Sequence, residues 1–410
     1  MTTSLHDCLC QLALDQHRSQ IAFLAELVRV PSDNPPGDCR RHADRAAELL
    51  EGLGFAVERH QVPDALVRAH GMISVTNLIV RHRFGPGPTI ALNAHGDVVP
   101  PGEGWSADPY GADIRDGSMY GRGVAVSKSD FATYAFALKA LIASGGLSAG
   151  TVELHLTYDE ESGGSIGPKW LLEQRLSRPD YAICAGFAYQ IVVAHNGCLH
   201  LEVRVRGKSA HAATPDAGID ALEAANGILA QIYAQRRSLA VKRSAVAGIA
   251  SPTLVVGLIE GGINTNVVPD LVSFRLDRRI IPEESPQAVE AELTRHLAEA
   301  GRRHPGIAVE TSRILLADPL IPGPEQEMLV AAIRRHANRV LGQDVAAAGV
   351  PLYTDARHYS AAGIPTVLYG AGPRTIAEAN AHRADERLKL DDLRKATQVV
   401  ALSLADLLAA

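Results

Sequence analysis

The chain of 410 residues is poor in aromatic residues, which make up 5% of it, and it contains no internal repeat or low-complexity segment. Hydrophobic residues at 46% and charged residues at 21% are typical of a soluble globular protein and exclude a disordered chain. No apolar run reaches membrane-spanning length. Because the chain is longer than one ordinary hydrophobic core requires, we expect two domains.

Net positive charge is absent as well. A net charge of −6 and a pI near 6.2 give no reason to expect nucleic acid or an anionic membrane as a partner. The cysteines are odd in number and lack a zinc-ribbon spacing, which fits free thiols in a reducing cytosol. Asp7 and Asp15 interrupt the N-terminal stretch, so it does not resemble a secretion signal, and we expect a cytoplasmic protein. The five cysteines are Cys8, Cys10, Cys39, Cys184 and Cys198.

Strand and helix patterns alternate along most of the chain, which predicts an α/β sheet domain. Between residues 197 and 312 the order becomes strand, helix, strand, strand, helix, strand, which is that of a ferredoxin-like module. We therefore expect an α/β domain made of residues 1–196 and 313–410, with the module inserted into it. A strand over 89–94 and helices over 4–29 and 128–144 are among the predicted elements.

The first candidate site residues are His95 and Asp97, which lie where the strand predicted over 89–94 ends. Ligands bind at the carboxyl ends of strands in open α/β sheets. A His-x-Asp at such a place can put an imidazole on a metal, with the carboxylate holding it in position. The same pair also fits an ordinary hydrogen-bonded surface histidine.

Three adjacent carboxylates, Asp159, Glu160 and Glu161, directly follow the strand predicted over 151–158. They repel one another, which is costly unless a cation or a catalytic role compensates for it. A solvated loop is the alternative, but the position at a strand end favours function. His382 lies in a loop before the last predicted helix and is uninformative alone.

Several motifs follow one another in a characteristic order, and together they resemble the acetylornithine deacetylase, succinyl-diaminopimelate desuccinylase, aminoacylase and glutamate carboxypeptidase family. This resemblance implies a mixed-sheet, zinc-peptidase-like catalytic domain with an inserted ferredoxin-like lid domain. It also implies two zinc ions and a homodimer formed through the lid. The motifs are HGDVVP at 95–100, YGRG at 120–123, DEE at 159–161, GKSAH at 207–211, NVVP at 266–269, TDAR at 354–357 and AH at 381–382.

The resemblance also implies roles for individual residues. His95 resembles a ligand of one metal, whereas Glu161 and His382 resemble ligands of the other. Asp97 matches the carboxylate that orients a histidine ligand, and Glu160 matches the general base. On the lid, His211 matches the residue that stabilises the carbonyl oxyanion, either within a chain or across a dimer. Three residues fall where family members bind substrate oxygens, often those of a carboxylate: Asn266, Arg279 and Arg357.

Two family ligands are missing. The family has a metal-bridging aspartate where this chain has Val126, and no carboxylate occurs between residues 117 and 129. Asp130 lies one helical turn further on. A second ligand is expected near Gly186, but no acidic residue occurs between Asp180 and Glu202. The two-metal site of the family therefore cannot form in the same way here.

Three hypotheses remain. In the first, one divalent metal, zinc or else manganese or cobalt, is held by the predicted ligands with Glu160 as base. In the second, a metal-free enzyme uses Lys128, Ser127, His95 and Glu160 for acid–base or nucleophilic work. Ser127 and Lys128 also fit a helix start with a serine cap and a solvated lysine. The third is a non-catalytic binding protein. We favour the first, as a cytosolic hydrolase of the C–N amide bond in a small N-acyl or N-carbamoyl amino acid or short peptide, whose carboxylate meets Arg279 or Arg357.

Overall fold

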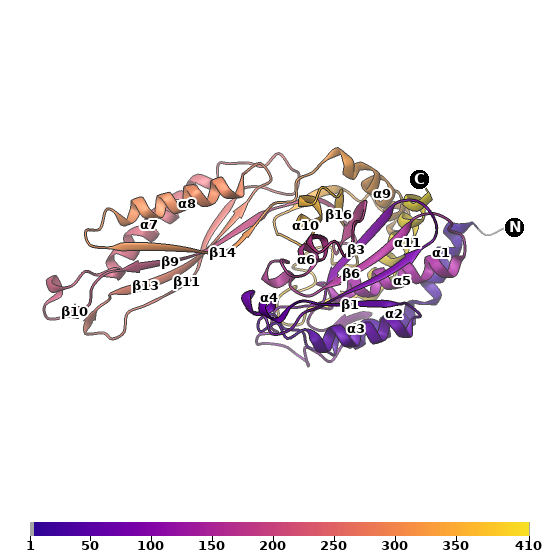
Figure 1. The fold of residues 1–410 in the computed structure, drawn as a ribbon, viewed down its shortest axis with the longest axis horizontal. Coiled ribbons are helices and arrows are strands. Elements are labelled where there is room, and N and C mark those ends of the chain that lie inside the picture. Colours follow the sequence, from indigo (N-terminus) through magenta and orange to yellow (C-terminus); the bar gives the residue numbers. More distant parts are fainter. Residues whose placement is uncertain (1–3, 410) are drawn as a thin grey trace. The chain divides into compact units, whose positions relative to one another are not determined.

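The structure is a computed structural model that describes residues 4–409. The chain forms two compact units (Figure 1). The first contains the chain up to Val193, Pro322–Ala348 and the chain from Thr354, and the second contains Ala194–Ile321 and Gly349–Tyr353. Each unit has a hydrophobic core of its own. The predicted division at residues 197 and 312 lies close to this one, but the short segment Gly349–Tyr353 carries no sequence signal of its own.

A mixed sheet of eight strands forms the centre of the first unit, in the order β1-β2-β6-β3-β7-β16-β8-β15. The central strands β3 and β6 run parallel with His95 opposite Thr157, whereas β1, β2 and β6 pair antiparallel. The mixed sheet confirms the predicted fold class. The strands are β1 (Val57–Gln61), β2 (Thr76–Arg83), β3 (Thr89–His95), β6 (Thr151–Thr157), β7 (Tyr181–Cys184), β8 (Ile191–His195), β15 (Ala347–Val350) and β16 (Thr366–Leu368).

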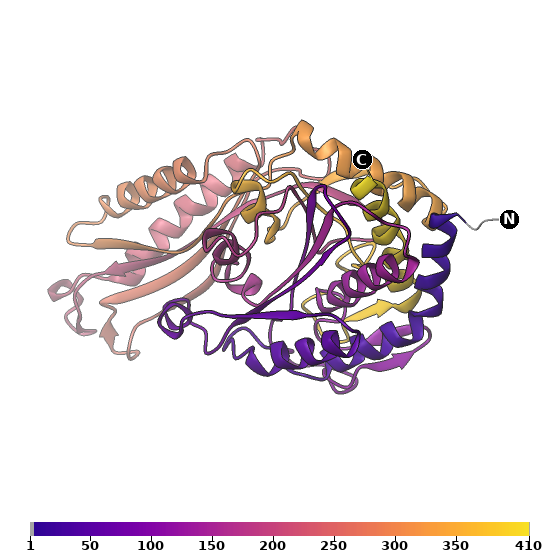
Figure 2. The same ribbon diagram turned by 45° about the vertical axis from the view of Figure 1, so that its right-hand side comes forward.

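The helix α5 (Lys128–Ser144) is buried along almost its whole length, because α1 (Leu5–Asp15), α2 (His17–Val28), α11 (Leu390–Ala409) and the strands β3 and β6 all contact it. Helices α1 and α11, from opposite ends of the chain, lie side by side in Figure 2. The single helix predicted over 4–29 is in fact two, because the first ends at Asp15. The apolar spacing continues across that break and therefore hides it.

Smaller elements complete the first unit. A three-stranded sheet in the order β17-β5-β4 joins the 113–120 region to the segment before α11. The sequence patterns did not predict it, since each strand has only three residues. Its strands are β4 (Asp113–Arg115), β5 (Ser118–Tyr120) and β17 (Arg387–Lys389). The remaining helices are α3 (Arg40–Gly52), α4 (Asp64–Ala69), α6 (Pro168–Glu173), α9 (Glu327–Leu341) and α10 (Ala356–Ala361).

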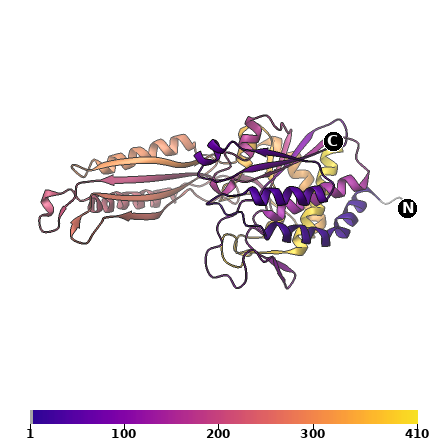
Figure 3. The same cartoon turned by 60° about the horizontal axis from the view of Figure 1, so that its bottom comes forward.

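The second unit is an antiparallel sheet in the order β11-β13-β9-β14, with α7 and α8 side by side on one face (Figures 1 and 3). Alternate apolar residues of the strands form its core against these helices. Along the chain its order is βαββαβ. Its elements are β9 (Gly197–Arg206), α7 (Ala221–Leu239), β11 (Thr253–Gly261), β13 (Leu271–Ile280), α8 (Pro286–Gly301) and β14 (Ala308–Ala317), with a short ladder of β10 (Ala210–His211) and β12 (Val267–Val268).

Across residues 4–409, none of the helices combines the length and the apolar character needed to cross a membrane.

Candidate active site

The predicted residues His95, Glu160 and Glu161 meet at one edge of the large sheet. His95 ends β3, and the chain after β6 turns into a short 3-10 helix over Glu160–Ser162. Because β3 and β6 are parallel neighbours, their carboxyl ends lie at the same edge. One donor atom from each of the three side chains lies within 4.8 Å of the other two. This set of one imidazole and two carboxylates fits a divalent cation.

Asp97 supports this group from beneath and is fully buried. Its carboxylate accepts hydrogen bonds from the backbone N–H of Glu160 at 3.3 Å and of Glu161 at 3.2 Å. The Nδ1 of His95 lies 3.0 Å from the Asp97 carbonyl and 3.4 Å from its carboxylate. The Asn34 amide donates to the same carboxylate at 2.9 Å. Asp97 therefore ties the histidine and the acidic loop together, and Asn34 is a supporting residue that its loop sequence did not reveal.

His382 joins this group from the far end of the chain. Its Nε2 lies 3.5 Å from Oε1 of Glu161. Its backbone φ of 60° is in the left-handed region, which is uncommon for a residue other than glycine, and Asn380 and Asp385 of the same loop share it. We refer to His95, Glu160, Glu161 and His382 as the ligand cluster.

The electrostatics of the ligand cluster favour a cation. Burial lowers the pKa of His95, but its hydrogen bond to Asp97 and the charges of Glu160, Asp97 and Glu161 outweigh this and raise the pKa well above its usual value. Burial raises the pKa of Glu160 to about 7, and the negative charges of Glu161 and Asp97 add to that effect. The hydrogen bond to Glu161 raises the pKa of His382. Negative charge is therefore in excess here.

The two missing family ligands leave no acidic residue at their own positions, Val126 and Gly186. A side chain at Gly186 would place its Cβ 2.8 Å from the backbone of Leu368 and Tyr369, so that position has no room for one. Asp130 is buried, and its Oδ1 accepts a hydrogen bond from the Ala371 N–H at 2.7 Å. Burial raises its pKa to about 7. Asp130 thus holds the 370–371 loop.

At Val126, the other missing ligand position, the neighbouring charges form a separate pair. Oε1 of Glu386 accepts hydrogen bonds from the backbone N–H of Ala125 at 3.0 Å and of Val126 at 3.2 Å. Its Oε2 accepts one from Arg122 at 2.6 Å, and both side chains are 1% exposed. The Arg122–Glu386 pair therefore fixes the backbone next to the ligand cluster.

Ser127 and Lys128, two residues of the metal-free hypothesis, contact backbone groups. The Ser127 hydroxyl donates to the His95 carbonyl and accepts from the His95 N–H, both at 3.1 Å. The buried Lys128 ammonium donates to the carbonyls of Leu27 at 3.2 Å and Val30 at 3.0 Å, and burial lowers its pKa to about 7. The interpretation as a serine cap and a solvated lysine is therefore wrong. These contacts also give the metal-free hypothesis no Ser–Lys pair.

Arg357, a predicted substrate ligand, is 4% exposed and holds the loop behind Glu160. Its guanidinium donates to the carbonyls of Thr354 and Gly163. Next to it, both carboxylate oxygens of Asp355 are buried without a hydrogen-bond partner among the described residues. Burial, then Glu160 and Asp159, raise the pKa of Asp355 well above its usual value. Asp355 lies in the TDAR motif at 354–357, but the resemblance implied no role for it.

The other predicted residues belong to the second unit. The Nδ1 of His211 accepts a hydrogen bond from the Ala213 N–H at 3.0 Å. Asn266 is exposed, and its carbonyl accepts from Ala212 at 3.0 Å. Arg279 pairs with Asp277 at 3.0 Å and lies over the ring of Tyr353.

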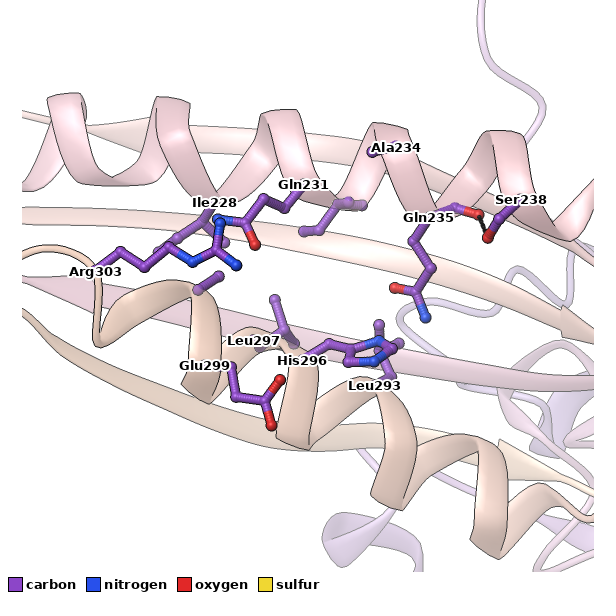
Figure 4. Close-up of a pocket in the computed structure, with 12 residues that line it drawn as sticks. Ile228, Gln231, Ala234, Gln235, Ser238, Leu293, His296, Leu297, Glu299 and Arg303 are labelled. Carbon is purple, nitrogen blue, oxygen red and sulfur yellow. Dashed lines mark hydrogen bonds between the residues drawn. The ribbon is translucent and has the colours of Figure 1, made fainter.

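The second unit also has a pocket of about 440 Å³ between α7 and α8 (Figure 4). Its floor is apolar, with Ile228, Leu293 and Leu297, and Gln231 and Gln235 of α7 point toward α8. None of the predicted site residues lines it.

A mixed-sheet unit with an imidazole and carboxylates at its sheet edge fits a hydrolase of the metallopeptidase and amidohydrolase class. The sequence matches peptidase family M20/M25/M40 over residues 91–406. The chain belongs to this family.

Individual relatives agree with this. The succinyl-diaminopimelate desuccinylase of Rhodospirillum centenum is 27% identical, covering 92% of this chain and 95% of that protein. The acetylornithine deacetylase of Myxococcus xanthus is 30% identical, covering 88% and 90%. The fold is similar to human carnosine dipeptidase 1, with a TM-score of 0.79, 18% identity and full coverage of both chains. It is also similar to Bacillus subtilis YXEP, described as a dinuclear metal-binding peptidase, with a TM-score of 0.67, 18% identity and coverage of 97% and 99%.

Proposed function

We propose that the protein hydrolyses the amide bond of a small N-acyl or N-carbamoyl amino acid or short peptide, using one divalent metal held by His95, Glu161 and His382. The observation that carries this proposal is the convergence of His95, Glu160 and Glu161 within 4.8 Å, with His382 3.5 Å from Glu161. Two histidines and a glutamate are a known catalytic zinc set. When bound, the metal supplies an acidified water and polarises the carbonyl.

In this proposal Glu160 is the general base. It takes a proton from the attacking water and passes it to the leaving amine. Burial raises the pKa of Glu160, whereas a bound cation would lower it, so the two effects oppose each other at the proposed base. Asp97 contributes by position, since it holds the N–H groups of Glu160 and Glu161 and the imidazole of His95.

His211 is proposed to stabilise the developing oxyanion. Because its Nδ1 accepts the Ala213 N–H, the proton of the neutral ring resides on Nε2. The ring can therefore donate a hydrogen bond to an oxyanion without being charged. Asn266 and Arg279 are proposed to bind the substrate carboxylate, together with any donor of Arg357 that its backbone contacts leave available.

The proposal is tested on purified protein by metal analysis and by hydrolysis of a panel of N-acyl amino acids, N-carbamoyl amino acids and dipeptides. We expect about one divalent ion per chain. Glu160→Gln should lower kcat by about 10²- to 10⁴-fold and retain the metal, whereas His95→Ala should lose metal and activity together. Hydrolysis that resists metal removal would refute the metal-dependent mechanism. Metal binding without turnover on any substrate would favour the binding protein.

We also propose a homodimer formed through the edge strand β11 of the second unit. This strand leaves Leu258 61% and Ile259 54% exposed, which is unusual for an edge strand without a partner. Light scattering should show a dimer that Leu258→Asp converts to a monomer. The equally apolar Ile114, 52% exposed in the first unit, provides the control variant Ile114→Asp.

A further inference from the structure

Four charged or metal-ligating side chains of the second unit lie together on two neighbouring strands. In the antiparallel pair of β9 and β13, Cys198 lies opposite Arg279 and His200 lies opposite Asp277. Residues two apart on a strand share a face, so all four belong to the same face of the sheet. Because the intervening residues Leu199 and Leu201 belong to the core against α7 and α8, this is the face turned away from those helices.

The donor atoms of Cys198, His200 and Asp277 form a triangle. One donor atom of each lies within 4.8 Å of the other two. The Nε2 of His200 is 3.0 Å from Oδ2 of Asp277, and the Nε of Arg279 is 3.0 Å from Oδ1. Arg279 therefore orients the Asp277 carboxylate through Oδ1, while Oδ2 faces His200. Fixing a carboxylate by a second residue is what outer-shell partners of metal ligands do.

A nucleophilic cysteine triad is a poorer match for this arrangement. In such a triad the imidazole stands between the thiol and the carboxylate, so that one ring nitrogen faces each. Here the Cys198 sulfur and the Asp277 carboxylate are themselves within 4.8 Å. Three donors around a common point fit an ion better than a proton relay.

We propose that Cys198, His200 and Asp277 form a second metal site, for a zinc-class divalent transition metal. A thiolate, an imidazole and a carboxylate are the ligand types that zinc takes, and three protein ligands leave a fourth position for water. Cys198 is fully buried, whereas the side chains of His200 and Asp277 are 32% and 29% exposed, so the site has an open side. On binding, the Cys198 thiol releases its proton to solvent.

This site shares no metal ligand with the ligand cluster, although Arg279, which orients Asp277, is also proposed to bind the substrate carboxylate. It also has a spectroscopic signature that the ligand cluster lacks. A thiolate bound to cobalt(II) gives an intense near-ultraviolet charge-transfer absorption, whereas imidazole and carboxylate ligands do not. The ligand cluster contains no cysteine.

The experiment titrates the metal-free full-length protein with cobalt(II) under reducing, oxygen-free conditions and records the near-ultraviolet spectrum. In the wild type, the charge-transfer band should reach its maximum after about one equivalent has bound at this site. The band should persist in His95→Ala and in Cys39→Ser, a matched replacement of another fully buried cysteine. It should vanish in Cys198→Ser. A wild type without the band, or a band that survives Cys198→Ser, would overturn the proposal.

His200→Gln is the second variant, because its partly exposed ring can be replaced without disturbing the core. We expect cobalt affinity at this band to fall at least about tenfold. Circular dichroism checks that each variant is folded. If Cys198→Ser does not fold, unchanged affinity in His200→Gln would by itself reject the site.

Discussion

The Arg122–Glu386 pair and the ligand cluster are two groups of charged side chains in the first unit, yet their charges are balanced differently. In the pair, both oxygens of Glu386 are met by donors, from Arg122 and from the backbone N–H of Ala125 and Val126. In the ligand cluster, Glu160 and Glu161 form no ion pair with a lysine or arginine of residues 4–409, and their charges help to raise the pKa of His95. A charged group whose donors and acceptors are all paired is typical of a structural role. A group with surplus charge of one sign is typical of a cation site or a catalytic site.

Breaking the Arg122–Glu386 pair should give the largest loss of stability. Glu386→Ala leaves the Arg122 guanidinium buried without its carboxylate, which should cost about 3–5 kcal/mol in the free energy of unfolding. Urea denaturation measures this. Glu51→Gln removes one partner of an exposed pair with Arg59 and should leave the midpoint unchanged. Equal effects of the two variants would contradict the distinction between buried and exposed pairs.

Asp97→Asn tests the support beneath the ligand cluster. The amide keeps one acceptor oxygen for the loop N–H groups but loses the second and the charge that orients His95. We expect about 10- to 100-fold weaker metal binding and a loss of about 1–3 kcal/mol in the free energy of unfolding, because one loop N–H loses its acceptor. Competition with a chromogenic chelator measures the affinity. An unchanged affinity would mean that the acidic loop holds its position without Asp97.

Gly186→Ala tests whether the position of the second missing family ligand has room for any side chain. Its Cβ would lie 2.8 Å from the backbone of Leu368 and Tyr369, so we expect a loss of about 1–3 kcal/mol. Thermal unfolding measures it. Gly257 has an open environment and no unusual φ, so Gly257→Ala serves as the matched control. A fully stable Gly186→Ala would show that the backbone there can give way.

A third buried group, Glu153 with Arg81 and His155, tests the pH dependence of a balanced cluster. Burial alone would raise the pKa of Glu153, but His155, Ser177 and Arg81 lower it to about 2. Because this lies below the usual glutamate pKa, the stabilisation is present at neutral pH and is lost as the pH falls through about 2. Glu153→Gln should cost about 1 kcal/mol at pH 7, and the difference from wild type should shrink below about pH 4. A constant difference over that range would contradict the assigned partners.

The sequence could indicate His95, Glu160 and Glu161 because short apolar runs mark strands, and residues just beyond them fall at the sheet edge. The bounds predicted for α5, residues 128–144, are those observed. The pairing of His382 with Glu161 came only from the resemblance, since no local pattern relates residues so far apart.

The contacts that distinguish a buried charge from a solvated one were beyond sequence reasoning. Lys128 lies at a helix start, where a lysine is ordinarily solvated, yet backbone carbonyls surround it. Asp130 and Glu386 likewise bind backbone N–H groups of distant segments. Such partners depend on tertiary packing, and residue type alone does not reveal them.

The long segment of the second unit, Ala194–Ile321, begins and ends at almost the same point. The N–H groups of His195 and Leu320 each donate to the other's carbonyl at 3.1 Å, and Cys198 then pairs with Ala317 as β9 and β14 run on together. A segment whose two ends are already joined in this way can be gained, exchanged or lost as a block, because its removal leaves only a short gap to bridge. The first unit can therefore keep its architecture while the inserted block is replaced.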